Sequence, residues 1–168
     1  KIPVQRLSIN ANISTSSQAT ISSNDFSSSL VNRGYKEVIT YSFISNEMHE
    51  LVDPNSAKIL LKNPISDDMA VMRSSLWSGL IQSAKSNIRR GHHNARFFEL
   101  GQCFTGTLVE DQVQKIAGII CGNRYDSQWA EGEREVDFFD AKSDVEALLF
   151  HSKNEYTFEA AEHPALKL

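Results

Sequence analysis

Features of secreted, membrane-spanning and metal-binding proteins are scarce in this sequence. Its 168 residues include only two cysteines, Cys103 and Cys121, and neither lies in a CxxC pair or completes a zinc-binding pattern with histidines. No apolar run reaches the roughly 20 residues that a membrane-spanning helix needs. Residues 1–4 lack the apolar core of a signal peptide. We therefore expect a cytoplasmic protein whose cysteines are reduced and which holds no metal.

An excess of positive charge is also missing, because 17 Lys and Arg face 21 Asp and Glu, a net charge of -4. Proteins dedicated to nucleic-acid binding are usually basic. One local basic cluster consists of Lys85, Arg89, Arg90 and Arg96. Cations are favoured at the C-terminal end of a helix, which the first three would occupy. The cluster is therefore either a solvated helix end or a face that contacts carboxylates or phosphates.

Motifs for phosphate binding and nucleophilic catalysis are absent, since the chain has no GxxxxGK[ST], GxGxxG or GxSxG. Two carboxylates, Asp137 and Asp140, flank a pair of phenylalanines and could form a metal site or an acid–base pair. Aspartates are also common helix caps. We favour the structural interpretation, in which Asp140 caps a helix and Asp137 lies in the preceding loop.

What the chain does contain is a polar opening followed by helical and extended patterns. Residues 8–29 hold nine serines and offer no apolar face, so we expect residues 1–25 to be a linker and residues 26–168 a domain. A first short helix is predicted from a cap at Asn24 or Asp25 to a left-handed glycine at Gly34. Further patterns predict helices at 46–52, 76–90 and 140–149, and strands at 36–44, 57–62, 96–104, 113–122 and 156–158.

The order of these elements indicates how the sheet is built. Strands 96–104 and 113–122 have a short connection, which is typical of an antiparallel pair. Strand 113–122 is nearly continuously apolar and is therefore expected at the centre of the sheet, buried on both faces. The fold class predicted is α+β, a mostly antiparallel sheet flanked by helices.

Six phrases, in this order, carry a family resemblance. They are LVNRGYKEVITYSF (30–43), NPIS (63–66), MRSSLWSGL (72–80), RFFELG (96–101), AGIICGNR (117–124) and VDFFDAK (136–142). Together they closely resemble the catalytic-like module of bacterial phenylalanyl-tRNA synthetase β subunits, over residues 26–168. One departure is Ser143, which stands where the family usually has glycine. Both ends of the chain look cut, so we expect a piece of a longer subunit that is truncated at its C-terminus.

The resemblance implies a class II synthetase fold within an enzyme of two α and two β subunits. In that family the α subunit joins phenylalanine to ATP and then to tRNA, and this β module packs on α as a degenerate copy of it. ATP and Mg²⁺ are used by the holoenzyme. The resemblance therefore implies no cofactor, no metal and no catalytic residue in this fragment.

The residues themselves oppose catalysis by the module. Activation of an amino acid places negative charge on the α-phosphate, which an enzyme must meet with a cation or a metal. Class II enzymes supply an arginine in their second motif, yet residues 97–114 contain no Lys, Arg or His. We therefore favour a non-catalytic assembly module. The alternatives are a competent class II ligase domain, and a tRNA-contacting module that uses Lys85, Arg89 and Arg90.

An assembly module should expose an apolar patch when it is alone. The first predicted helix, its neighbouring strand and the helix at 76–90 offer large apolar side chains for such a patch. The interface residues predicted on this basis are Phe26, Leu30, Tyr35, Tyr41 and Trp77.

Overall fold

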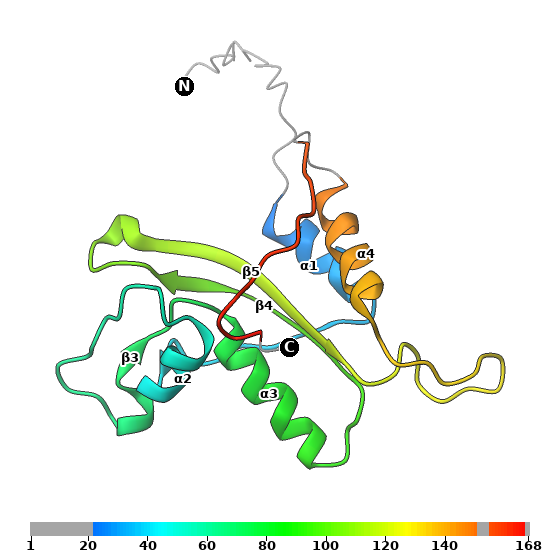
Figure 1. Ribbon diagram of the computed structural model, residues 1–168, viewed down its shortest axis with the longest axis horizontal. Helices are drawn as coiled ribbons and strands as arrows, with labels where there is room; N and C mark the ends of the chain where they lie inside the picture. Colours follow the sequence, from blue (N-terminus) through cyan, green and yellow to red (C-terminus); the bar gives the residue numbers. More distant parts are fainter. Residues whose placement is uncertain (1–21, 151–154, 167–168) are drawn as a thin grey trace, which may run out of the picture.

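A three-stranded sheet forms the centre of the computed structural model, which describes residues 22–150 and 155–166 (Figure 1). Strand β4 (Ala95–Phe104) lies in the middle, parallel to β1 (Lys36–Glu37) and antiparallel to β5 (Gln112–Cys121). The β4–β5 pair runs unbroken from Ala95 opposite Cys121 to Phe104 opposite Gln112. A short 3-10 helix (Val109–Asp111) forms part of their connection. The α+β fold with a mostly antiparallel sheet is confirmed.

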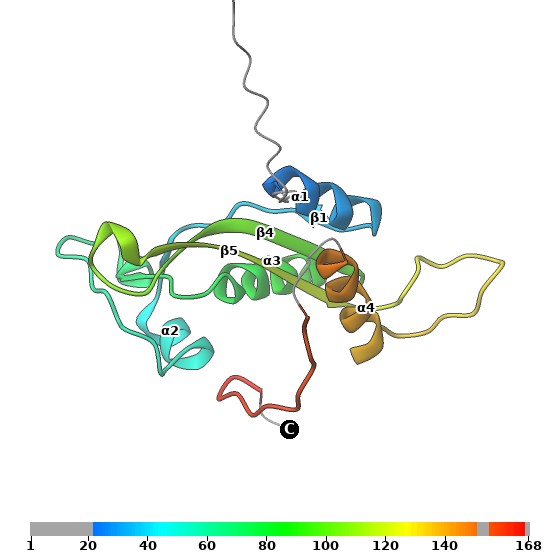
Figure 2. The same ribbon diagram turned by 90° about the horizontal axis from the view of Figure 1, so that it is seen from above.

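Helices cover both faces of this sheet. Side chains alternate between the two faces along β4, so each face presents apolar residues against which a helix packs. On one face, Phe97 and Cys103 pack against α3 (Trp77–Arg89). On the other face, Phe98 packs against α1 (Ser23–Asn32) and α4 (Phe138–Leu149). Figure 2 shows α1 and α3 on opposite sides of β4. The two hydrophobic cores are thus separated by the sheet itself.

A second, smaller sheet lies at one end of the first. It pairs β2 (Phe43–Ile44) antiparallel with β3 (Val71–Met72). Helix α2 (Asn46–Val52) follows β2, and a 3-10 helix (Asp67–Met69) precedes β3. In the described ranges, no helix has the length and apolar character needed to cross a membrane.

Several predicted strands are shorter than expected or absent. Strand 36–44 is wrong as one element, because it divides into β1 and β2 of different sheets, with residues 38–42 between them in neither. Residues 57–62 make only one bridge, between Leu60 and Val71, and residues 156–158 form no strand. Short apolar runs predict extended backbone, but a ladder also requires a partner strand alongside.

The predicted centre of the sheet is also wrong. Among the described residues β5 has a neighbour on one side only, and its side chains are half-buried or exposed. The central strand is β4, which holds fully buried side chains such as Phe98. The sequence of β4 contains charged and small residues between its apolar ones. A prediction that looks for an unbroken apolar run therefore does not recognise β4 as the buried strand.

Helix ends follow local side-chain chemistry, with two corrections. Helix α1 is capped by Ser22, whose hydroxyl accepts from the Asp25 amide, so the predicted cap at Asn24 or Asp25 is wrong. Residues 1–21 of the predicted linker lie outside the described part. Helix α4 is capped by Asp137, while the Asp140 carboxylate accepts a hydrogen bond from the Asp137 amide. The prediction that Asp140 caps this helix and that Asp137 lies in the preceding loop is therefore wrong, because Asp137 is the cap and Asp140 belongs to the first turn. Gly34 has a φ of +86°, as its predicted position after the first helix requires.

We expect Asp137→Ala to lower the free energy of unfolding by about 1 kcal/mol, because two amides of the first turn of α4 lose their acceptor. Urea unfolding followed by circular dichroism measures this change. Asp137→Asn is the matched control, since its amide oxygen can still cap the helix. Equal stability of the alanine variant and the parent chain would contradict the capping role.

Candidate functional site

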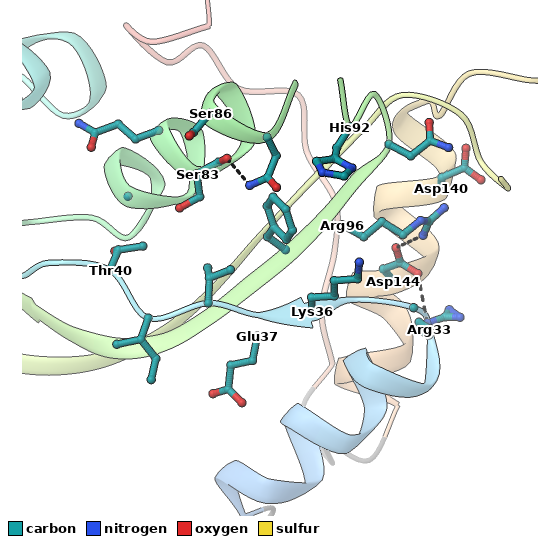
Figure 3. Close-up of a pocket in the computed structure, with 18 of the residues that line it drawn as sticks. Arg33, Lys36, Glu37, Thr40, Ser83, Ser86, His92, Arg96, Asp140 and Asp144 are labelled. Atoms are coloured by element: carbon teal, nitrogen blue, oxygen red, sulfur yellow. Dashed lines mark hydrogen bonds and ion pairs between the residues drawn. The ribbon is translucent and has the colours of Figure 1, made fainter. Parts of the chain in front are cut away.

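A broad cleft of about 1910 Å³ runs beside β1, one of the two edge strands of the larger sheet within the described residues (Figure 3). One wall is the outer side of α3, and the other wall includes the beginning of α4 and the residues after β5. Segment 38–42, which follows β1, continues along the cleft. The cleft therefore lies where the sheet ends and where three separate parts of the chain meet.

Most charges that line the cleft are already paired. Asp144 of α4 receives the guanidinium groups of Arg33 at 3.2 Å and Arg96 at 3.7 Å. The Tyr35 hydroxyl donates to the same carboxylate at 2.6 Å. Burial, followed by this contact with Asp144, raises the pKa of Tyr35 well above its usual range. The Tyr35 hydroxyl therefore stays protonated near neutral pH and acts as a hydrogen-bond donor.

A second carboxylate, Asp140, serves the other end of the cleft. Its oxygen Oδ1 lies 2.8 Å from Arg134 Nη2 and 3.6 Å from Arg124 Nε. The hydrogen bond from Arg134, followed by the Asp137 amide, holds the pKa of Asp140 below its ordinary value. Asp140 thus acts as an anion that attaches the segment 122–137 to α4 through Arg124 and Arg134. Both Asp140 and Asp137 are ion-paired with arginine, so neither is arranged as a free acid or base.

Two cations in the cleft, Lys36 and Arg90, have no ion-pair partner among the described residues. In Figure 3 the Lys36 side chain points toward the side of the cleft where His92 and Arg96 lie, while Glu37 points the opposite way. Three carboxylates of the cleft lining, Glu37, Asp68 and Asp126, also have no ion-pair partner among the described residues, so the cleft carries unpaired charges of both signs.

A buried ion pair lies behind the wall formed by segment 38–42. Arg73 Nη1 is 2.7 Å from Glu99 Oε1, and the two side chains are only 4% and 2% exposed. Glu99 also accepts the Thr40 amide at 3.2 Å and the Thr40 hydroxyl at 2.7 Å. Arg73 donates further to the Gln102 carbonyl at 2.9 Å. The contacts of Arg73 and Glu99 named here are therefore all made with groups of the same chain.

Two glycines make room for this arrangement. A Cβ at Gly79 in α3 would overlap the Thr40 side chain, and a Cβ at Gly101 in β4 would overlap the Arg73 guanidinium. Neither Arg73 nor Glu99 was among the residues singled out by sequence analysis. Both stand in phrases that carry the family resemblance, and a charged residue amid the apolar phrase FFELG was the available signal.

The predicted interface residues fall into two groups. Leu30 and Tyr35 are buried inside the chain, with exposed fractions of 3% and 6%, so they belong to its core and are unavailable to a partner in this conformation. Phe26 is half-buried. Tyr41 is 72% exposed and Trp77 is also exposed, although its ring meets His163 edge-on. Their roles remain predictions.

One residue that sequence analysis did not select, Ile39, is the most exposed large apolar residue along the cleft, at 94%. It stands in the run of β-branched residues that was predicted to form a strand, where alternate side chains would be buried. Segment 38–42 leaves the ladder after Val38, so Ile39 and Tyr41 both face solvent.

The predicted basic cluster is divided by the structure. Lys85, Arg89 and Arg90 are exposed along α3 and its end, and of these only Arg90 lines the cleft. Arg96 points instead to Asp144 and to the Arg124 carbonyl. The hypothesis that the first three contact phosphate stays a prediction.

A family model described as "Phenylalanyl tRNA synthetase beta chain CLM domain" matches residues 2–167. The chain belongs to this family. Among curated relatives, the phenylalanine–tRNA ligase beta subunit of Pseudomonas putida is 51% identical over 82% of the chain, and that of Coxiella burnetii is 41% identical over 99%. These stretches are 18% and 21% of the relatives' own lengths, so the chain spans about a fifth of the subunits it matches.

Solved structures with the same arrangement of elements are other aminoacyl-tRNA synthetases. A pyrrolysyl-tRNA synthetase of Desulfitobacterium hafniense matches 76% of this chain and 42% of its own, with a TM-score of 0.54 and 13% identity. A histidine–tRNA ligase subunit of Alicyclobacillus acidocaldarius matches 74% and 33%, with a TM-score of 0.51 and 16% identity. At such identities the likeness establishes the class II synthetase fold, which confirms the predicted architecture.

We expect Arg73→Met to destabilise the chain by about 3–5 kcal/mol, because it leaves the Glu99 carboxylate buried without its cation. Adding Glu99→Leu to this variant should recover part of the loss, so the two substitutions should be strongly non-additive in urea unfolding. Lys85→Met, which removes an exposed cation, is the control and should change stability by less than about 0.5 kcal/mol. Additive costs for the pair would show that the two charges do not depend on each other.

Proposed function

We propose that this chain is a non-catalytic assembly module of a phenylalanine–tRNA ligase β subunit. It packs on the catalytic α subunit of a cytoplasmic enzyme with two α and two β subunits, which attaches phenylalanine to tRNA with ATP and Mg²⁺. The observation that carries the proposal is the pair of bare apolar side chains, Ile39 and Tyr41, beside the open cleft of a chain that belongs to the β-chain family.

The state of the cations supports a module without its own chemistry. Stabilising an adenylate transition state requires a cation free to meet the developing charge. Between Phe97 and Gln114 the β4–β5 hairpin has none. Arg73 is buried against Glu99, and Arg96 is directed to Asp144. The positive groups nearest the centre of the sheet therefore stabilise the protein itself.

Exposed apolar side chains support assembly. Aromatic and large aliphatic anchors contribute much of the free energy of protein association when they become desolvated at the centre of an interface. Tyr41 and Ile39 stand together at the open edge of the sheet, where no other part of the described chain covers them. A partner chain would bury both side chains and the cleft beside them.

The proposal is tested by mixing the full-length β chain with its α subunit in a calorimeter, with an ATP titration of the β chain alone as the paired control. We expect binding to α and no heat with ATP. ATP binding without association would instead indicate a competent ligase domain, and it would contradict the assembly function. A β chain that is folded but silent in both titrations would contradict it too.

The tRNA-contacting alternative has a separate test. In the holoenzyme, we expect Lys85→Ala, Arg89→Ala and Arg90→Ala combined to leave the KM for tRNA within about twofold, because these side chains belong to a solvated helix end. Lys58→Ala and Lys62→Ala, which lie outside the cleft, serve as charge controls. A rise of about tenfold in KM at low salt, which shrinks relative to the parent enzyme as the salt concentration rises, would favour the alternative.

A further inference from the structure

Segment 38–42 is irregular in secondary structure, yet it is held at every second residue. The Val38 amide donates to the Phe98 carbonyl at 2.9 Å, and the Ser42 carbonyl accepts from the Arg73 amide at 2.9 Å. Between them, Thr40 is held by Glu99 through both its amide and its hydroxyl. Because side chains of an extended backbone alternate in direction, these attachments leave Ile39 and Tyr41 facing away from the protein.

The middle attachment is made by an ion pair rather than by a strand. An amide of residue 40 would ordinarily meet a neighbouring backbone carbonyl, but here it meets the Glu99 carboxylate, which Arg73 Nη1 contacts at 2.7 Å. A buried ion pair contributes little stability relative to apolar residues of the same size. Here the ion pair fixes the position of Thr40. The position of Thr40 in turn fixes the directions of the Ile39 and Tyr41 side chains.

Such a fixed segment is suited to binding. A flexible loop with two bare apolar side chains would lose conformational entropy on association, whereas a segment that is already held loses less. The close approach of Thr40 to α3, which only a glycine at position 79 permits, restricts the segment further. The apolar pair is therefore presented in one preformed orientation.

The surroundings indicate the chemistry of the partner surface. Glu37 lines the same cleft and has no ion-pair partner among the described residues. It shares its side of the extended segment with Ile39 and Tyr41, whereas Lys36 points to the other side, toward His92 (Figure 3). A surface that covers Ile39 and Tyr41 must also meet the Glu37 carboxylate, because unpaired buried charge is strongly unfavourable. The complementary surface therefore combines an apolar recess with at least one cation.

We propose that the Arg73–Glu99–Thr40 network is a positioning device that presents Ile39 and Tyr41 as a preformed anchor for the α subunit. The anchor enters an apolar recess of that subunit bordered by a cation that meets Glu37. This inference rests on the proposed assembly function, and it assigns the docking segment and the residues that aim it.

The test compares two variants that each remove one hydroxyl hydrogen bond to a buried carboxylate. Thr40→Val removes the bond to Glu99, and Tyr35→Phe removes the bond to Asp144 on the opposite face of the sheet. Full-length β chains carrying each change are titrated with the α subunit by sedimentation equilibrium, and their Tm values are measured in parallel. We expect similar decreases in Tm, an affinity at least tenfold weaker for Thr40→Val, and an affinity within about twofold of the parent for Tyr35→Phe.

Three further variants support the comparison. Thr40→Ser keeps the hydroxyl and should restore binding. Gly79→Ala displaces Thr40 without removing any charge and should weaken binding as Thr40→Val does. Ile39→Ala removes part of the anchor itself and should weaken association at least tenfold with an unchanged Tm, because this side chain is fully exposed before binding.

Each outcome has a distinct meaning. Equal affinities for Thr40→Val and Tyr35→Phe, with Ile39→Ala impaired, would overturn the positioning role and leave the assembly function intact. Full affinity of Ile39→Ala would overturn docking through this segment, again with assembly intact. Failure of the parent β chain to bind α would overturn the proposed function itself.

Discussion

The ion pair between Arg73 and Glu99 connects the residue after β3 of the small sheet to β4 of the large sheet. Arg73 directly follows β3, and its backbone amide and carbonyl bond to Ser42 and to the Phe104 amide. Its side chain reaches Glu99 and the Gln102 carbonyl of β4. One residue therefore links the small sheet to the central strand of the large one, and the position of segment 38–42 follows from that link.

On the opposite face of the sheet, Asp144 has a comparable role. Its carboxylate connects α4 to the end of α1 through Arg33 and to β4 through Arg96. The same carboxylate accepts a hydrogen bond from the Tyr35 hydroxyl. Ser143, the departure from the family pattern, lies inside α4, and its hydroxyl and carbonyl accept from Arg33 Nη2 at 3.0 and 2.7 Å. The serine thus adds a contact between α1 and α4 and leaves the start of α4 to Asp137.

These two networks support the proposal that this chain keeps a synthetase fold without synthetase chemistry. Arginines that could meet a nucleotide phosphate are directed to Glu99 and Asp144, carboxylates of the same chain. Once a cation is desolvated against an internal carboxylate, recruiting it to a ligand would leave that carboxylate uncompensated. The scaffold is then free to serve association, which needs a stable shape and exposed apolar side chains rather than available charge.

The sequence by itself determined the elements that depend on local spacing and on the family pattern. Helices α3 and α4, the paired strands β4 and β5, and the turn glycine Gly34 all follow from periodicity or caps within a few residues. Tertiary structure decided that β4 is central, that Leu30 and Tyr35 are internal, and that Ile39 faces solvent. The physical reason is that these outcomes depend on groups far apart in the chain. Glu99 lies 59 positions after Thr40 and 26 after Arg73, and only the folded backbone, with glycine at position 79, brings the three together.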